Sequence, residues 1–300
     1  MNKPTLVIMA AGMGSRYGAT KQIDVFGPSG ESLMDYAIYD AINLGFGKIV
    51  IVVSPTIEHA IQERYQFVKA FGLDFHTALQ SLEVFDFGIK TPTNRIKPWG
   101  TGHALLMAEK YVTEPFVLIN ADDFYGHQTL EKTASRIVTM PVVNRHVLTA
   151  FRLKNTLSEH GFVSRAVCKT DAKNLLVEIL EAESIGRDAA GNIIISMPEQ
   201  FSGAAGERMV SMNCWGFSPS IFTPLKRLFE AFLHADNLES AEFFIPFAIQ
   251  QLIGAKEISV EVNCTEQPWF GVTWPEDKAY VRSRILQLVD QEQYPEKLFG

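Results

Sequence analysis

The chain has 300 residues, of which 47% are hydrophobic and 20% are charged, and it contains 21 glycines and 14 prolines. This composition is that of a globular protein and excludes a disordered, collagenous or coiled-coil chain. The net charge is −7, and no cluster of Lys and Arg stands out. Nucleic-acid and membrane-surface partners are therefore disfavoured, because affinity for phosphate backbones needs concentrated positive charge.

The three cysteines, Cys168, Cys214 and Cys264, are far apart in the sequence and form no C-x-x-C or zinc-type pattern. We therefore expect no disulfide framework and a reducing compartment. The first residues lack a signal-peptide pattern, and the uncharged stretch 209–225 is interrupted by Ser, Asn, Gly and Pro. These features predict a cytoplasmic protein without a membrane partner.

Short apolar runs alternate with helical patterns in the first half of the chain. We expect strands at 6–10, 49–53 and 116–119, and helices at 33–44, 57–71 and 103–111. The all-apolar run 49–53 is typical of a parallel strand that is covered on both faces. The alternation predicts an α/β fold with a Rossmann-like wound, mostly parallel mixed sheet.

The second half is less regular. The expected strands are 147–151, 161–168, 175–181, 192–197, 211–217 and 258–262, and the expected helices are 221–234, 239–253 and 277–291. No repeat, low-complexity tract or linker divides the chain. We therefore expect one continuous domain over residues 1–300 with a helical C-terminal part.

The most informative segment is the loop after the first strand. Small residues come first, and two cations follow: Ala10, Ala11, Gly12, Gly14, Ser15, Arg16 and Lys21. Small residues let the backbone approach a ligand, and successive N–H groups can point at a phosphate while the cations add positive charge. The loop follows a strand end, where open α/β sheets bind ligands. The alternative is a tight turn with Arg and Lys nearby by chance.

Two common phosphate-binding loops do not fit this segment. The dinucleotide fingerprint G-x-G-x-x-G would need glycine at position 17, which is Tyr17, and the P-loop would need G-K-[ST] five residues after Gly12. A dehydrogenase or a P-loop ATPase is therefore disfavoured.

A second polar element follows the third expected strand, where Asp122 and Asp123 come directly after Asn120 and Ala121. A carboxylate at a strand end can hold Mg²⁺, which prefers oxygen ligands and neutralises phosphate charge. The alternative for Asp123 is a cap on the next helical turn.

Residues 11–16 together with Lys21 resemble the G-x-G-[TS]-R…K signature of the sugar-nucleotide pyrophosphorylases, which join a nucleoside triphosphate to a sugar 1-phosphate. The resemblance implies the nucleotide-diphospho-sugar transferase fold. It also implies that the loop backbone and Arg16 hold the triphosphate, and that Lys21 touches the phosphates or the attacking sugar phosphate. The resemblance further implies that Asp122 binds the metal ion, with Asp123 as the adjacent alternative.

The resemblance extends to looser segments. Gly102 matches a segment that contacts the base and nucleoside, and Lys97 stands where relatives often have a Gln that reads the base. Trp99 either stacks on the base or covers a helix end. The residues implied to bind sugar hydroxyls are Gly161, Glu181 and Asn213.

Two departures from the family pattern leave alternatives open. Gly271 stands where relatives often have a second metal-binding Asp, and its substitute could be Asp123, Glu266 or Asp277. Ala182 stands where relatives often have a Lys that holds the sugar phosphate. Either Arg165 or Arg187 replaces that Lys, or the acceptor differs from a plain hexose phosphate.

The resulting hypothesis is a Mg²⁺-dependent nucleotidyltransferase that releases pyrophosphate and forms an NDP-sugar, with Arg16, Lys21 and Asp122 as its catalytic residues. Its partners would be an NTP and a sugar 1-phosphate, and a homo-oligomer is compatible with the sequence. The domain would consist of a nucleotide-binding half (1–130), a sugar-phosphate-binding half (131–265) and a C-terminal helix (266–300). The alternatives are a cytidylyltransferase acting on a non-sugar phosphate and a catalytically silent binding protein of the same fold.

Overall fold

The computed structural model describes residues 3–12, 24–84, 87–140, 143–195, 197, 204–234 and 237–300. Within these ranges, ten strands form one mixed sheet and two short strands form a separate ribbon. The first half of the sheet is parallel, in the order β3 (Asp74–Leu79), β2 (Lys48–Val53), β1 (Thr5–Met9) and β4 (Phe116–Asn120). Apolar runs supply β1, β2 and most of β4, and these strands are buried on both faces.

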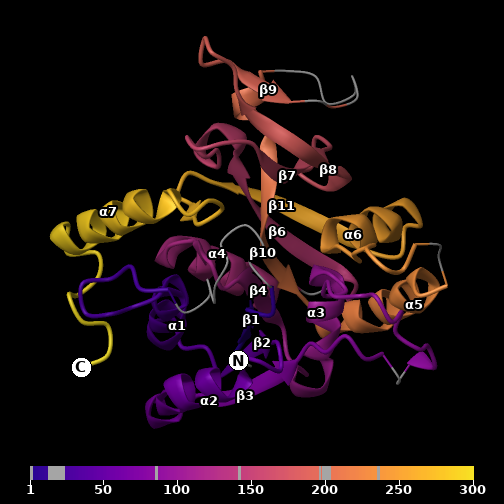
Figure 1. The fold of residues 1–300 in the computed structure, drawn as a ribbon, viewed down its shortest axis with the longest axis horizontal. Helices are drawn as coiled ribbons and strands as arrows, with labels where there is room; N and C mark the ends of the chain where they lie inside the picture. Colours follow the sequence, from indigo (N-terminus) through magenta and orange to yellow (C-terminus); the bar gives the residue numbers. More distant parts are fainter. Residues whose placement is uncertain are drawn as a thin grey trace.

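The second half of the sheet is largely antiparallel. Strand β10 (Met209–Phe217) runs antiparallel to β4 and joins the two halves. It also pairs with the strands β6 (Arg145–Arg152) and β7 (Val163–Thr170), and the sheet continues through β8 (Leu176–Arg187) and β9 (Ile193–Ile195), while β11 (Ser259–Thr265) runs parallel to β6. The group β7, β8 and β9 extends at the top of Figure 1.

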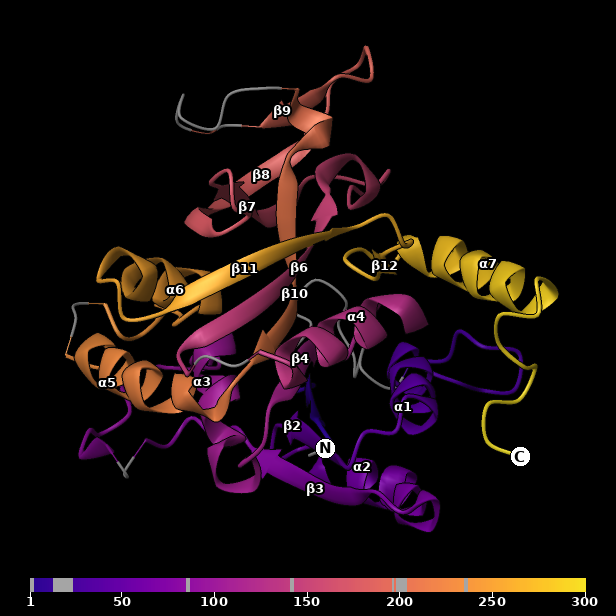
Figure 2. The ribbon, with the colours of Figure 1, turned by 180° about the vertical axis from the view of Figure 1, so that it is seen from behind.

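Helices cover both faces of the sheet. One face packs against α1 (Leu33–Asn43), α2 (Glu58–Tyr65) and α4 (His127–Val138), and the other against α3 (Thr101–Met107), α5 (Phe222–Phe232) and α6 (Ile245–Gly254). The pleat of β1 explains this arrangement, because Leu6 and Ile8 lie in one core and Val7 and Met9 in the other. Figures 1 and 2 show these helices on opposite sides of the strands.

Short elements complete the chain. The 3-10 turns are η2 (Gln66–Phe71), η4 (Glu109–Tyr111), η5 (Leu153–Asn155), η7 (Ala205–Glu207) and η8 (Pro219–Ile221). The two-stranded ribbon joins β5 (Asp123–Phe124) to β12 (Phe270–Gly271), just before the last helix, α7 (Asp277–Asp290). Among the described residues, no helix has the length and apolar character needed to cross a membrane.

The expected wound α/β fold is confirmed, with differences in individual elements. The structure adds β3, α4 and the ribbon, which the apolar patterns did not predict. The helix expected over 239–253 begins at Ile245, because Pro246 occupies its first turn, where a missing N–H is tolerated. Trp99 neither stacks in an open site nor covers a surface, since it is fully buried, and its indole N–H donates to the Leu82 carbonyl at 2.8 Å.

The C-terminal tail packs against α1 and α4 through a buried carboxylate. Asp40 accepts a hydrogen bond from the Tyr294 hydroxyl at 2.8 Å and lies 3.1 Å from His127 Nδ1. Burial raises the pKa of Asp40 to about 6, although the contacts with Tyr294 and His127 oppose the shift. Compared with the unfolded chain, the folded protein therefore favours the protonated form of Asp40.

We predict that Asp40 makes the protein less stable as pH rises from about 4 to 6. The native pKa lies above that of the unfolded chain, so the native state binds the extra proton in this window and loses stability as it is released. The Asp40→Asn variant cannot ionise, and its unfolding free energy should fall less over the window, by up to about 3 kcal/mol. Urea denaturation at several pH values measures this difference. The exposed Asp290→Asn serves as control, and equal pH slopes for Asp40→Asn and the parent protein would contradict the prediction.

Candidate active site

Strands β1 and β4 end side by side. They are parallel neighbours in which Met9 pairs with Asn120, and Ala121 N–H donates to the Met9 carbonyl at 3.0 Å. The segment that starts at Ala10 therefore leaves the sheet beside the segment that carries Asp122. Ala10 and Ala11 are buried, and Gly12 is exposed. The predicted residues Gly14, Ser15, Arg16 and Lys21 lie outside the described residues.

A cavity of about 640 Å³ opens at this edge of the sheet. It brings together four of the predicted residues from three places in the chain: Asp122 and Asp123 after β4, Glu181 on β8 and Asn213 on β10. Parallel and antiparallel strands meet here, because β10 joins the two halves of the sheet. A crevice at the carboxyl ends of parallel strands is the usual ligand site of open α/β folds.

A chain of amide hydrogen bonds fixes the floor of the cavity. Asn120 Nδ2 donates to Asp123 Oδ2 at 2.8 Å, and Asn213 Nδ2 donates to Asn120 Oδ1 at 3.3 Å. The Tyr125 hydroxyl accepts from the Asn120 N–H at 3.1 Å and donates to the Met212 carbonyl at 2.6 Å. Side chains whose orientations are fixed in this way are suited to bind a ligand without reorganisation.

An irregularity in β10 allows Asn213 to join this series of hydrogen bonds. The pairing of β10 with β6 shifts between Ser211 and Trp215, and Asn213 has a φ of 58°. Asn tolerates this left-handed conformation better than most residues, because its short polar side chain can hydrogen-bond locally. The bulge directs the amide of Asn213 toward Asn120 instead of leaving it in the regular pleat.

Arg165 places a buried cation beside the cavity. Its Nε and Nη2 donate to the Thr156 carbonyl, at 3.2 and 2.5 Å, and its Nη1 donates to the Ser164 carbonyl at 2.8 Å. Burial lowers the pKa of Arg165 to about 10, against the opposing effect of carboxylates that include Asp123 and Glu181. Arg165 is therefore still positively charged at neutral pH.

The pairing of β7 with β8 places Arg165 beside Ala182, the position where relatives often have a Lys. Arg165 pairs directly with Ala182, and directly paired residues point to the same face of a sheet. The chain therefore carries a cation on the neighbouring strand, on the face where Ala182 offers only a methyl group. Arg187, the other candidate from the sequence, is exposed, and its Nε lies 4.0 Å from a Glu159 carboxylate oxygen.

Glu181 stands on the wall of the cavity near this cation. Glu181 is an exposed residue by surface area, but the surrounding wall of the cavity removes part of the water around its carboxylate. This desolvation raises the pKa of Glu181 to about 7, with Arg165 lowering it and Glu183 raising it. Glu181 therefore changes its charge near neutral pH.

Gly271 faces Asp123 across the two-stranded ribbon, in which the two residues are direct partners. A Cβ at position 271 would fall on Asp123 Oδ1, well inside contact distance. The Asp123 carboxylate thus fills the space that a side chain at position 271 would need. Of the three substitutes left open by the sequence, Asp123 is the one whose carboxylate lies at this place.

Several predicted residues lie apart from the cavity lining. Gly102 packs against Phe243, whose carbonyl accepts its N–H at 2.8 Å, so close packing accounts for this glycine. Lys97 lies exposed in the loop before α3. Gly161 packs against Trp274, and a Cβ placed on Gly161 would lie 3.1 Å from the indole ring. The roles in ligand binding expected for these three residues stay predictions.

The cavity also contains acidic residues that the sequence reasoning missed or set aside. Glu183 lines it two residues beyond Glu181, and Glu242 lines it from the segment before α6. The alternation of side chains along a strand could have identified Glu183, since residues two apart share a face. Glu242 lies within the helix expected over 239–253 and was interpreted as a charge near the start of that helix, whereas in the structure it precedes α6.

The acidic pair formed by Asp122 and Asp123 suits a magnesium ion that is also bound by a substrate. Among the described residues, no group of three or more His, Cys, Asp and Glu side chains could hold a metal ion. Mg²⁺ typically uses one or two carboxylates, retains waters and takes further oxygens from phosphates. Asp122 and Asp123 provide two carboxylates, adjacent in sequence, in the lining of the same cavity, which fits that mode of binding.

Comparisons with known proteins agree with this geometry. Residues 5–174 match the family model described as nucleotidyl transferase. Since the match covers more than half of the chain, the chain belongs to this family and is a nucleotidyltransferase. The resemblance of its first loop to this class of enzymes is thereby confirmed. No curated protein matches the sequence.

Solved structures share the fold at low sequence identity. The inositol-1-phosphate CTP transferase from T. maritima has a TM-score of 0.61 and 14% identity, over 95% of this chain and 97% of that chain. A protein described as a glucose-1-phosphate thymidylyltransferase from Bacillus anthracis, in complex with sucrose, has a TM-score of 0.64 and 14% identity, over 94% of both chains. A UDP-glucose pyrophosphorylase in complex with UDP-glucose has a TM-score of 0.60 and 15% identity, over 95% of this chain and 99% of that chain.

We predict that Gly271→Asp destabilises the protein by about 2 kcal/mol or more, because the new side chain would overlap the Asp123 carboxylate and add a like charge. Removing the Asp123 carboxylate should make room for the new side chain at position 271. In the Asp123→Gly background, Gly271→Asp should therefore cost much less stability than in the parent protein, so the double variant Asp123→Gly/Gly271→Asp should be nearly as stable as Asp123→Gly alone. Urea denaturation of the three variants measures the coupling, and additive effects would show that the two positions do not compete for one space.

Proposed function

We propose that this nucleotidyltransferase transfers a nucleotidyl group from an NTP to a sugar 1-phosphate. The observation that carries the proposal is the single cavity in which the acidic pair after β4 meets Glu181, Asn213 and the buried cation Arg165. Such a set offers acceptors and donors for hydroxyl groups together with a positive charge for a phosphate.

The acceptor would lie between β8, β10 and the ribbon. The Glu181 carboxylate accepts hydrogen bonds from sugar hydroxyls, and the Asn213 amide can both donate and accept. The positive charge of Arg165 attracts the acceptor phosphate. Arg165 thereby supplies the cation that Ala182, its partner on the neighbouring strand, does not provide. Gly161 is retained in this proposal as a residue of the sugar site.

The nucleotide would lie at the adjacent ends of β1 and β4. Ala10, Ala11 and Gly12 begin the loop that would surround the triphosphate, and Gly14, Ser15, Arg16 and Lys21 continue it in the sequence. Lys97 and Gly102 are the proposed base-side residues. In this arrangement residues 1–130 form the nucleotide-binding half of a single domain and residues 131–265 form the acceptor-binding half.

Asp122 and Asp123 would hold Mg²⁺, which supplies charge neutralisation at the phosphates when bound. Asn120 keeps the Asp123 carboxylate oriented through the hydrogen bond to Oδ2. The acceptor phosphate is already ionised at neutral pH, so no general base is needed. An acceptor oxygen attacks the α-phosphorus in line, the bond to the bridging oxygen breaks, and pyrophosphate leaves; the protein contributes positioning and electrostatics.

The direct test is pyrophosphate release with CTP, dTTP, UTP, ATP and GTP against a panel of acceptors. Glucose 1-phosphate and inositol 1-phosphate belong in the panel, because two proteins of similar structure are named as transferases for these compounds. We expect turnover with at least one sugar 1-phosphate. Turnover with the inositol phosphate alone would support a non-sugar acceptor instead, and binding without turnover in any pair would support a silent binding protein.

We predict that Asp122→Asn lowers kcat by about a thousandfold or more, because the amide cannot neutralise phosphate charge through a bound metal ion. The exposed Glu131→Gln on α4 removes one negative charge elsewhere and should retain the parent kcat. Chelation by EDTA should abolish turnover of the parent enzyme, and added Mg²⁺ should restore it. Full activity of Asp122→Asn with an intact fold would exclude this role for Asp122.

We predict that kcat/KM for the acceptor rises by about tenfold between pH 6 and pH 8. The pKa of Glu181 is about 7, and only its ionised form accepts hydrogen bonds from hydroxyls at both oxygens. The Glu181→Gln variant should have a lower kcat/KM without this rise. The ratio of the two enzymes at each pH removes the ionisation of the acceptor itself, and a ratio that is constant from pH 6 to 8 would contradict the assignment.

A further inference from the structure

The acceptor cavity contains many more acidic than basic side chains. Among the described residues, its lining includes one cation, Arg165, and five carboxylates: Asp122, Asp123, Glu181, Glu183 and Glu242. Under the proposed function the first two of these carboxylates bind the metal ion. Three glutamates are then left on the acceptor side, where the acceptor phosphate adds further negative charge, and like charges at close range repel one another.

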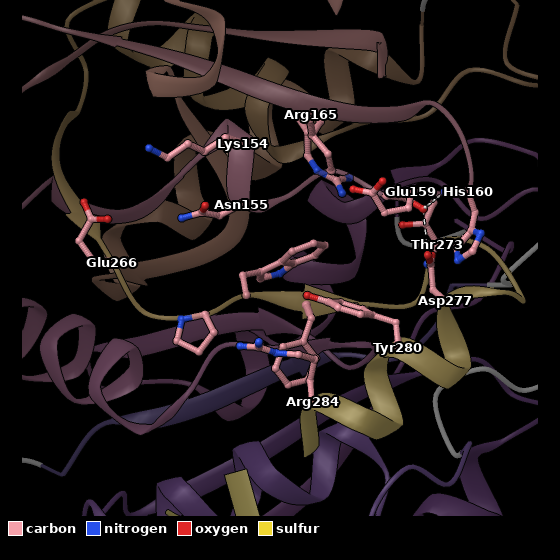
Figure 3. Close-up of a pocket in the computed structure, with 16 residues that line it drawn as sticks. Lys154, Asn155, Glu159, His160, Arg165, Glu266, Thr273, Asp277, Tyr280 and Arg284 are labelled. Atoms are coloured by element: carbon pink, nitrogen blue, oxygen red, sulfur yellow. Dashed lines mark hydrogen bonds between the residues drawn. The ribbon is translucent and has the colours of Figure 1, made fainter. Parts of the chain in front are cut away.

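Other cations of this region lie outside the acceptor cavity. Figure 3 shows the neighbouring pocket, which shares Arg165 and Thr273 with the acceptor cavity and also contains Lys154 and Arg284. Lys154 and Arg284 do not line the acceptor cavity, and Lys154 already forms an ion pair with Glu207 at 2.5 Å. Within the described ranges, Arg165 is therefore the one lining residue that offsets the charge of the glutamates.

Two of these glutamates, Glu181 and Glu183, come from the same strand, β8. In the part of the chain that the structure describes, neither carboxylate forms a hydrogen bond or an ion pair. Glu183 contributes to the rise in the pKa of Glu181, as expected for negative charges that lie close together. A ligand with a positive charge at this place would relieve the repulsion between them.

The third glutamate, Glu242, faces the cavity from the segment before α6, and hydrogen bonds fix the backbone beside it. The N–H of Phe243 donates to the Trp99 carbonyl at 2.7 Å, and the Phe243 carbonyl accepts from the Gly102 N–H at 2.8 Å. The Glu242 carboxylate itself has no hydrogen bond or ion pair to a described residue. A carboxylate is thus held at a fixed place in the cavity wall with its acceptor capacity available to a ligand.

Arg95 attracts Glu242 electrostatically, but its own hydrogen bonds go elsewhere. Arg95 is 4% exposed, its Nη1 donates to the Leu238 carbonyl at 2.5 Å, and its Nη2 donates to the Pro98 carbonyl at 2.7 Å. Its guanidinium lies 3.7 Å from the centre of the Trp99 ring, and it does not line the cavity. Arg95 therefore leaves the oxygens of Glu242 accessible from the cavity.

The arrangement of these carboxylates suits an organic ammonium better than a metal ion. As noted above, no group of three or more His, Cys, Asp and Glu side chains in the described ranges could hold a metal ion. A primary ammonium has three N–H donors and can serve carboxylates that are further apart, whereas a quaternary ammonium has none. Phe244, which is 39% exposed, and Trp269 line the same cavity, and aromatic rings also favour a cation.

We propose that the acceptor is an amino sugar 1-phosphate, whose protonated amino group binds to the carboxylates of Glu181, Glu183 and Glu242. This inference rests on the proposed transfer to a sugar 1-phosphate and narrows its substrate class. The phosphate lies toward Arg165, and the ammonium lies toward the glutamates, which stabilise its charged form. The amino group takes no part in bond formation, so the transfer step is unchanged.

The test compares kcat/KM for the 2-, 3-, 4- and 6-amino derivatives of glucose 1-phosphate with kcat/KM for their N-acetyl forms and for glucose 1-phosphate itself, with each of the NTPs. The N-acetyl forms keep the nitrogen but are neutral, and phosphocholine tests for a quaternary ammonium. The parent protein is compared with Glu242→Gln and Glu183→Gln. The matched control is Glu239→Gln, because Glu239 is exposed and lies outside the cavity.

We expect at least one amino derivative to have a kcat/KM about tenfold or more above those of its N-acetyl form and of glucose 1-phosphate. This preference should fall by about fivefold or more in Glu242→Gln and Glu183→Gln, because an amide carries no charge, and it should be unchanged in Glu239→Gln. A variant that is merely misfolded would lose activity with all acceptors alike and would leave the preference unchanged.

Two results would overturn the inference and leave the proposed function intact. One is a neutral sugar 1-phosphate that is used as well as every amino derivative, and the other is an equal preference for the amine in the parent protein, Glu242→Gln and Glu183→Gln. Preferred turnover of phosphocholine would overturn the inference in favour of a non-sugar acceptor. The absence of turnover with any sugar 1-phosphate would contradict the proposed function itself and the inference with it.

Discussion

The parallel pairing of β1 with β4 is the constraint on which the rest of the site depends. Its register joins Met9 to Asn120, and both strands are buried on both faces, so a shift of either one would disrupt the packing of both cores and leave buried backbone groups unpaired. The register brings the small-residue segment that begins at Ala10 next to the acidic pair. The start of the loop that we predict to bind phosphates and the two carboxylates that we predict to bind a cation thus lie at one edge of the sheet.

The remaining strands turn that edge into a specific site. Strand β10 runs antiparallel to β4, and its bulge directs the Asn213 amide to Asn120, which in turn orients Asp123. The ribbon holds Asp123 from the other side, with Gly271 leaving space for its carboxylate. The acidic end of β4 is therefore held by hydrogen bonds from one side and by close packing from the other.

The sequence predicted those parts whose signal is local. Continuous apolar runs identified β1, β2 and β4. The polar residues at their ends led to the predicted site, which stays a prediction. Helix α4 was missed because Thr129 and Thr133 occupy its buried face and interrupt the apolar period. Strand β3 was missed because polar residues alternate along it. Positions set by long-range pairing could not be predicted either, among them the alignment of Arg165 with Ala182 and the contact between Asp123 and Gly271.

A crystal structure of the protein with Mg²⁺ and a non-hydrolysable NTP analogue tests the central claim most directly. The account predicts the triphosphate beside Ala10–Gly12 at the ends of β1 and β4, with an Asp122 oxygen about 2.1 Å from the metal ion. A triphosphate bound elsewhere on the chain, or a metal ion held without Asp122 and Asp123, would contradict it.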